Sequence, residues 1–139
     1  MSLLTGAADV ATRRMPKLLS PDAHCAVDYV MVGSFAAAGM WFWRRNRRAA
    51  LASWICGGSM LGLTLLTSYP GKQRRAVAYP LHGKVETGIA AMVAAMPEFL
   101  RLEGDRERHY FTVKAGLLTI LSNLTSFTAA ERARMRRAG

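Results

Sequence analysis

The sequence predicts an all-α fold: an integral membrane four-helix bundle made of two parallel two-helix repeats, plus an amphipathic N-terminal helix at the membrane interface. Three observations predict it: long uncharged apolar stretches, basic residues clustered at their ends, and a match of the chain with itself at a fixed offset. Hydrophobic residues make up 51% of the 139 residues, yet the mean hydropathy is only +0.10 and the net charge is +10. The charged residues lie in short clusters between the apolar stretches, which is the pattern expected of a protein that crosses a bilayer.

The segment before the bundle is expected to form a helix that lies in the membrane interface. Apolar side chains recur mostly three or four positions apart from Leu3 to Leu19, and basic residues fill part of the gaps. Such a segment is too short and too polar to cross a bilayer. The chain divides accordingly into an interfacial helix, a transmembrane bundle of two repeats and a basic tail: residues 1–19, 20–129 (repeats 20–70 and 78–128) and 130–139.

The first hairpin is expected to have helices over residues 21–43 and 49–69. Ser20 supplies a hydroxyl cap, and Pro21 stands at the first helical position. The far end of this helix is rich in tryptophan and is followed by arginines, which is typical of an interfacial aromatic belt. Residues 49–71 carry no charge and are long enough to cross a hydrocarbon core of about 30 Å. Pro70 and the glycine after it indicate a turn.

The second hairpin is expected to have helices over residues 80–100 and 110–128, joined by a loop of mixed charge over 101–109. Pro80 opens it as a proline opened the first hairpin. With four crossings, both termini lie on one face, which carries more Lys and Arg than the opposite face. The positive-inside rule therefore favours a bacterial inner-membrane protein with both termini in the cytoplasm.

Two other classes of protein are disfavoured. A nucleic-acid-binding protein would combine its charge with a recognition motif, and none accompanies these basic clusters. A soluble helical bundle would need a polar face on each helix, which residues 49–69 lack. Cys25 and Cys56 lie in apolar helices without metal-ligand spacing. The expected partners are the lipid bilayer and either further copies of this chain or a larger membrane complex, with no nucleic acid.

An internal repeat emerges when the sequence is compared with itself at an offset of 58 residues, the separation of His24 and His82. At this offset Asp28 falls on Glu86, and Leu-Thr-Ser-Tyr at 66–69 falls on Leu-Thr-Ser-Phe at 124–127. Because each repeat crosses the membrane twice, both repeats enter from the same face. We therefore expect parallel repeats related by a pseudo-twofold axis along the membrane normal.

This arrangement resembles a known family. Tandem two-helix repeats, with a helix that ends in a small-proline-aromatic patch such as Ala95-Met96-Pro97-Glu98-Phe99, look like the SPW-repeat and related uncharacterised small bacterial membrane proteins. The first repeat has Gly39-Met40-Trp41 at the same place and lacks the proline. The resemblance covers residues 20–128 as architecture and implies no known activity.

The repeated polar residues form the candidate site. His24 and Asp28 are four residues apart, as are His82 and Glu86, so each pair shares one helix face near the same end of the bundle. Ionisable residues inside a membrane are costly and indicate function by default. Other polar residues are expected at the same depth in supporting roles: Thr67, Ser68, Tyr69, Thr125 and Ser126.

Several interpretations of this cluster stay open. In one, the residues form hydrogen bonds that hold the bundle together. In a second, His24, Asp28, His82 and Glu86 bind a divalent metal such as zinc or iron, with the carboxylates either as ligands or as partners that orient the imidazoles. In a third, the histidines ligate haem b or pigments. Less favoured is a proton or ion conduit along the two carboxylates.

The function expected from the sequence is that of a non-catalytic accessory or scaffolding membrane subunit. The alternative is a metal-, haem- or pigment-binding membrane protein that uses His24 and His82. No nucleophile motif, phosphate-binding loop or catalytic metal motif is present, so no catalytic residue is expected. His109 is expected in a loop at the opposite face, and Lys114 is expected to reach water from within its helix.

Overall fold

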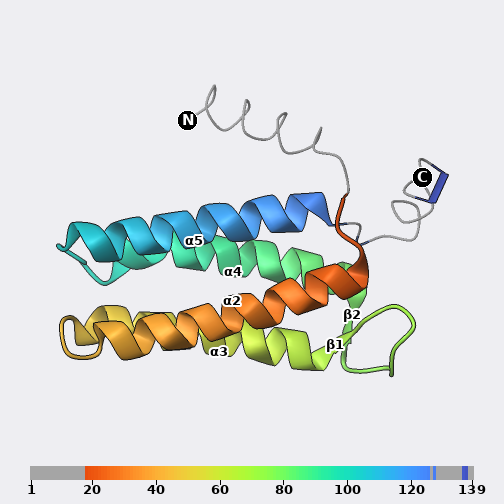
Figure 1. Ribbon diagram of the computed structural model, residues 1–139, viewed down its shortest axis with the longest axis horizontal. Helices are drawn as coiled ribbons and strands as arrows, with labels where there is room; N and C mark the ends of the chain where they lie inside the picture. The colour runs from red at the N-terminus through yellow and green to blue at the C-terminus, as the bar shows by residue number, and fades with distance from the viewer. Residues whose placement is uncertain (1–17, 126, 128–135, 138–139) are drawn as a thin grey trace.

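The computed structural model describes residues 18–125, 127 and 136–137. Four long helices run side by side in this part of the chain (Figure 1): α2 Pro21–Phe42, α3 Arg47–Leu66, α4 Tyr79–Phe99 and α5 Asp105–Leu124. The all-α prediction with four helices is confirmed. The predicted interfacial helix and the basic tail fall almost wholly outside the described residues.

The starts of the helices follow from their capping residues. Ser20 Oγ accepts a hydrogen bond from the Ala23 amide at 3.2 Å, and Asn46 caps α3 in the same way at 3.2 Å. The start of α5 was predicted wrongly at residue 110. The helix begins at Asp105 because carboxylates in its first turn, from Asp105 and Glu107, favour a helix N-terminus.

Helices α3 and α5 end earlier than predicted, at Leu66 and Leu124, because a threonine with extended backbone follows each helix. Thr67 starts the two-residue strand β1 (Thr67–Ser68), which pairs in parallel with β2 (Val77–Ala78). Thr125 forms a parallel bridge with Leu19. Leu19 and Val77 are themselves 58 residues apart, so the two pairings follow the offset found in the sequence.

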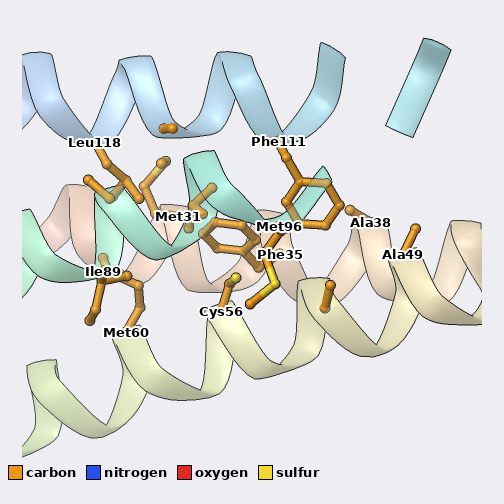
Figure 2. Packing of buried hydrophobic residues seen from close by; sticks show 14 of the residues in the cluster. Met31, Phe35, Ala38, Ala49, Cys56, Met60, Ile89, Met96, Phe111 and Leu118 are labelled. Atoms are coloured by element: carbon orange, nitrogen blue, oxygen red, sulfur yellow. The ribbon is translucent and has the colours of Figure 1, made fainter. Parts of the chain in front are cut away.

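The apolar core lies along the middle of the bundle (Figure 2), where Phe35 of α2 is completely buried together with Phe111 and Leu118 of α5. Close packing of α2 on α3 depends on Gly57. A Cβ atom placed there would lie 2.8 Å from Phe35 Cβ, which is too close for two carbon atoms. The core thus requires a glycine at this helix contact.

Two helices in the described part of the chain, α2 and α3, are long and apolar enough to cross a membrane. Helices α4 and α5 carry more charged residues and are not apolar enough to count as candidate membrane spans. Outside this core, Val30 and Met40 are about 70% exposed, whereas the charged side chain of Glu86 is fully buried.

Candidate metal centre

Four ionisable side chains meet at the end of the bundle next to β1 and β2. His24 and Asp28 project from the first two turns of α2, and His82 and Glu86 from those of α4. Four-residue spacing places each pair on one helix face. All four side chains are buried, with relative exposures of 0 or 1%. The structure therefore brings together the four residues singled out in the sequence.

Each imidazole faces the carboxylates of both hairpins. His24 Nε2 lies 3.3 Å from Asp28 Oδ1 and 3.2 Å from Glu86 Oε2. His82 Nε2 lies 3.2 Å from Asp28 Oδ2 and 4.0 Å from Glu86 Oε2. One nitrogen or oxygen atom from each of the four side chains lies within 4.8 Å of the other three. The four atoms thus surround one point.

The outer nitrogen of each histidine is bound to a threonine, and this fixes the tautomer. Thr67 Oγ1 donates its only proton to the Leu63 carbonyl at 2.5 Å, so it accepts from His82 Nδ1 at 2.8 Å. Thr125 bonds in the same way to the carbonyl four residues before it, at 2.8 Å, and accepts from His24 Nδ1 at 2.7 Å. In a neutral imidazole the unprotonated lone pair is then on Nε2, which faces the cluster.

The carboxylates are held by hydroxyl groups. Asp28 Oδ2 accepts from Tyr69 at 3.0 Å and from Thr64 at 3.5 Å, and Glu86 Oε2 accepts from Ser122 at 2.7 Å. Burial, reinforced by the nearby Asp28 charge, raises the pKa of the Tyr69 phenol above its ordinary value, so the phenol stays protonated and donates. These bonds fix both carboxylates without filling the space between them.

Three buried polar atoms in the cluster have no hydrogen-bond partner within the described part of the chain: His24 Nε2, His82 Nε2 and Glu86 Oε1. Buried polar groups are nearly always satisfied, because an unpaired one costs free energy. With both imidazoles neutral, the lone pairs of two nitrogens and two carboxylates would converge here and repel one another. A proton on each imidazole or a shared cation would remove this repulsion.

Aromatic rings close the cluster at its outer end. The ring of Phe127 lies 5.2 Å from that of His24 and 6.0 Å from that of His82, measured between centroids. Tyr79 lies 5.1 Å from Phe127 and 5.4 Å from Tyr69. The rings keep water from the cluster and so strengthen every electrostatic interaction inside it.

Comparisons with protein-family models, with curated proteins and with solved structures find no match for this chain. The function is therefore argued from the geometry of the cluster, and the resemblance to SPW-repeat proteins remains an expectation about architecture.

The supporting residues expected from the sequence separate into three groups. Thr67, Tyr69 and Thr125 contact the cluster directly. Ser68 does not: it is the second residue of β1, and its hydroxyl donates to the carbonyl of Arg75, in the loop before β2, at 2.9 Å. Ser126 lies outside the described residues. His109 lies away from the cluster, as expected, but the prediction that it lies in a loop is wrong: because α5 begins at Asp105, His109 is exposed on that helix and bonds to the Asp105 carbonyl.

The sequence analysis missed Thr64 and Ser122, which hold the carboxylates. Each is one of several hydroxyl residues in its helix, and such a hydroxyl usually bonds to its own backbone, so neither attracts attention by itself. The two residues are 58 positions apart, however, so the offset that related the two histidines was the signal that would have found them.

Proposed function

We propose that the chain is a membrane-embedded helical bundle that binds one divalent transition-metal ion, zinc or iron(II), through His24, Asp28, His82 and Glu86. The ion joins the two hairpins and makes the protein a non-catalytic, metal-stabilised scaffold. One observation carries the proposal: two imidazole nitrogens and two carboxylates come together in a buried cluster, with one ligand atom from each within 4.8 Å of the others, and neither Nε2 atom has a hydrogen-bond partner among the described residues.

The distances between the imidazoles and the carboxylates are close to those around a four-coordinate ion. Metal–ligand bonds of about 2.0–2.1 Å in a tetrahedron place neighbouring ligand atoms about 3.3 Å apart. Three of the four imidazole–carboxylate distances are 3.2 or 3.3 Å, through Oδ1 of Asp28 to His24 and Oδ2 of Asp28 to His82, and the fourth, between His82 Nε2 and Glu86 Oε2, is 4.0 Å. The four ligand atoms lie within 4.8 Å of one another and would draw closer around a bound ion. Two nitrogen and two oxygen ligands suit zinc or iron. Four protein ligands in a closed site are typical of a structural metal.

Charge balance favours a divalent ion. With both histidines neutral, Asp28 and Glu86 leave two negative charges in a site that water does not reach. Burying uncompensated charge is costly, and a doubly charged cation makes the cluster neutral. A monovalent or trivalent ion would leave a net charge.

The surrounding hydrogen bonds are those of metal sites. Ligating histidines nearly always donate their other N–H to a fixed acceptor, which sets the tautomer and the ring orientation. Thr67 and Thr125 play this part here, each for a histidine of the other hairpin. The threonine–histidine hydrogen bonds already link the two hairpins, and a bound ion would add a second link between them.

The geometry argues against a haem between the histidines. The oxygens of Asp28 lie 3.3 Å from His24 Nε2 and 3.2 Å from His82 Nε2, so its carboxylate takes up the space that a porphyrin plane would need. The two imidazole rings meet edge to face, with centroids 5.5 Å apart. A continuous path for ions is equally disfavoured, because the apolar core of Figure 2 lies beyond the cluster.

A metal-free scaffold is the competing function. If both imidazoles carry a second proton, two imidazolium–carboxylate pairs also give a neutral cluster that holds α2 and α4 together. A cluster that holds a metal ion and a cluster with two protonated imidazoles would use the same four residues. They differ in bound metal and in the response of stability to a chelator.

Elemental analysis of protein purified in detergent without chelators tests the proposal. We expect one zinc or iron ion per chain, and a lower thermal unfolding temperature once a strong chelator removes it. The double variant His24→Ala plus His82→Ala should bind no metal, whereas His109→Ala, which removes an exposed histidine, should bind as the wild type does. Metal-free protein whose stability is unaffected by added zinc or iron(II) would overturn the proposal in favour of the metal-free scaffold.

A further inference from the structure

A second buried charge lies away from the metal centre, on α5. Lys114 was expected to extend to water, but its side chain is only 9% exposed and turns towards α2. Its Nζ contacts Ser34 Oγ and lies 3.9 Å from Met31 Sδ. A buried ammonium group is costly wherever it lies, and more so within a membrane.

The Lys114 ammonium group lies away from the acidic residues that the structure describes. Among the described residues no carboxylate lies within ion-pair distance of it. Ser34 Oγ donates its own proton to the Met31 carbonyl at 2.7 Å and so accepts from Nζ. The other neighbours are ring faces, with Nζ 5.0 Å from the centroid of Phe35 and 5.7 Å from that of Tyr110. Ser34 Oγ thus accepts one hydrogen bond from an ammonium group that has three N–H donors.

Lys114 also lines a surface groove of about 540 Å³ beside α2 and α5. The walls are apolar: Trp41 and Val113, both more than half exposed, face it together with Tyr110. The rim at the start of α5 is formed by Asp105, Arg106 and His109. An apolar groove with a few placed polar groups is the usual form of a small-molecule site.

We propose that this groove, the Lys114 groove, binds a fatty-acid-class ligand: one carboxylate on a hydrocarbon body. The carboxylate would pair with Lys114, and the hydrocarbon would lie along Trp41, Tyr110 and Val113. Arg106 and Asp105 at the rim offset each other in charge, so Lys114 leaves the groove with one positive charge, which matches a head with one negative charge. The apolar walls match the hydrocarbon and would bury part of it.

The depth of Lys114 favours a carboxylate over a bilayer phospholipid. Lys114 is nine residues into α5, about 14 Å along the helix from its first residue. A phospholipid head is held at the membrane surface, where Arg106 lies nearer. A small carboxylate has no bulky headgroup and is able to reach the inner position.

Binding of cis-parinaric acid to the detergent-purified protein, followed by fluorescence and by displacement with laurate, tests the proposal. We expect one site per chain and at least a tenfold weaker affinity in Lys114→Met. The matched control is Lys84→Met, which removes an exposed lysine from α4 and should bind as the wild type does. Val113→Trp, which fills the groove and leaves Lys114 in place, should also weaken binding. Metal content should be unchanged in all three variants.

A second measurement on the wild type avoids dependence on the folding of Lys114→Met. Methyl laurate, which keeps the chain and loses the charge, should displace the probe at least tenfold less well than laurate. Equal displacement by the ester, or equal binding by Lys114→Met, would show an apolar groove without a carboxylate site and overturn the proposal. Competition by phosphatidylglycerol as strong as that by laurate would overturn the choice of ligand.

Discussion

At the scale of single residues, two threonines determine whether the proposed metal centre is able to bind an ion. Thr67 and Thr125 each give a proton to their own helix and accept one from a histidine. The direction of these bonds leaves Nε2 of each imidazole free for the centre of the cluster. A serine or threonine that bonded in the opposite direction would leave Nε2 protonated, and the same four residues would then bind no metal.

Replacing either threonine by valine should therefore weaken metal binding. Thr67→Val keeps the shape of the side chain but removes the acceptor of His82 Nδ1, and we expect metal affinity to fall about 10- to 100-fold. Competition with a chromophoric chelator measures this loss. Thr87→Val is the matched control, because the Thr87 hydroxyl also bonds four residues back, at 2.9 Å to Gly83, but holds no histidine. Equal affinities in the two variants would contradict this role of Thr67.

Glu86→Gln separates a metal-filled cluster from a proton-filled one. In a metal centre the variant should bind metal at least 100-fold more weakly, while the metal-free protein gains stability because two converging negative charges become one. In a proton-filled cluster the same variant breaks a buried ion pair and should lose about 3–5 kcal/mol of unfolding free energy. Thermal unfolding with and without a chelator reads out both effects. Loss of stability in chelator-treated Glu86→Gln would count against the metal centre.

The sequence predicts the ligating residues better than those that support them. His24 and His82 stand out because histidine is rare in this chain and both occur with a carboxylate four residues later. Thr64 and Ser122 do not stand out, because a hydroxyl in a helix usually bonds to its own backbone. Lys114 was misjudged for a different reason: whether a lysine extends outward or inward depends on the neighbouring helix, here on Ser34 of α2.

At the scale of the elements, apolar stretches located all four helices but not all of their ends. Helix α5 starts in residues whose charge resembles that of a loop. A threonine follows each of α3 and α5 and pairs with another segment: Thr67 with Val77 of β2, and Thr125 with Leu19 in an isolated bridge. Such ends are set by capping and by tertiary pairing, which an apolar pattern does not contain. The caps at Ser20 and Asn46 are local, and the first of them was predicted.

Close packing within the first hairpin gives a test at this scale. Gly57→Ala puts a Cβ atom 2.8 Å from Phe35 Cβ, so α2 and α3 must move apart, and we expect a loss of about 1–3 kcal/mol in unfolding free energy. The control is Gly58→Ala on the same helix, where the added Cβ has nothing within 4 Å. That change should stabilise the protein by up to about 1 kcal/mol through helix propensity. Chemical denaturation in detergent compares the two, and equal effects would refute the packing role.

At the scale of the whole molecule, the distribution of side chains supports insertion in a bilayer. Large apolar side chains cover the outside of the bundle, as at Val30, Ile55 and Val113, while the charged cluster is enclosed. Lipid would cover this outer surface, and it removes the cost of exposing it to water. The charged residues of α4 and α5 are partly explained by the same arrangement, because Glu86 faces the interior and Asp105 lies at a helix end.

Membrane fractionation and cysteine labelling test the proposed four crossings. The protein should stay with the membranes after alkaline carbonate extraction. In a background without Cys25 and Cys56, Arg74→Cys in the loop before β2 and Glu103→Cys in the loop before α5 should react with an impermeant maleimide from opposite sides. Arg74→Cys should be the cytoplasmic position if the positive-inside rule holds. Release by carbonate, or labelling of both positions from one side, would contradict the arrangement.

The way the cluster is shared between the hairpins bears on its origin. Each hairpin holds one imidazole, one carboxylate and the threonine that supports the imidazole of the other hairpin. Neither half is therefore able to assemble a complete site alone. An ancestor consisting of one hairpin would have completed the site only as a homodimer, with the shared ion on the symmetry axis between the two chains. Gene fusion would then have made that association permanent and freed the two halves to diverge, which would account for a tyrosine at position 69 and a phenylalanine 58 residues later.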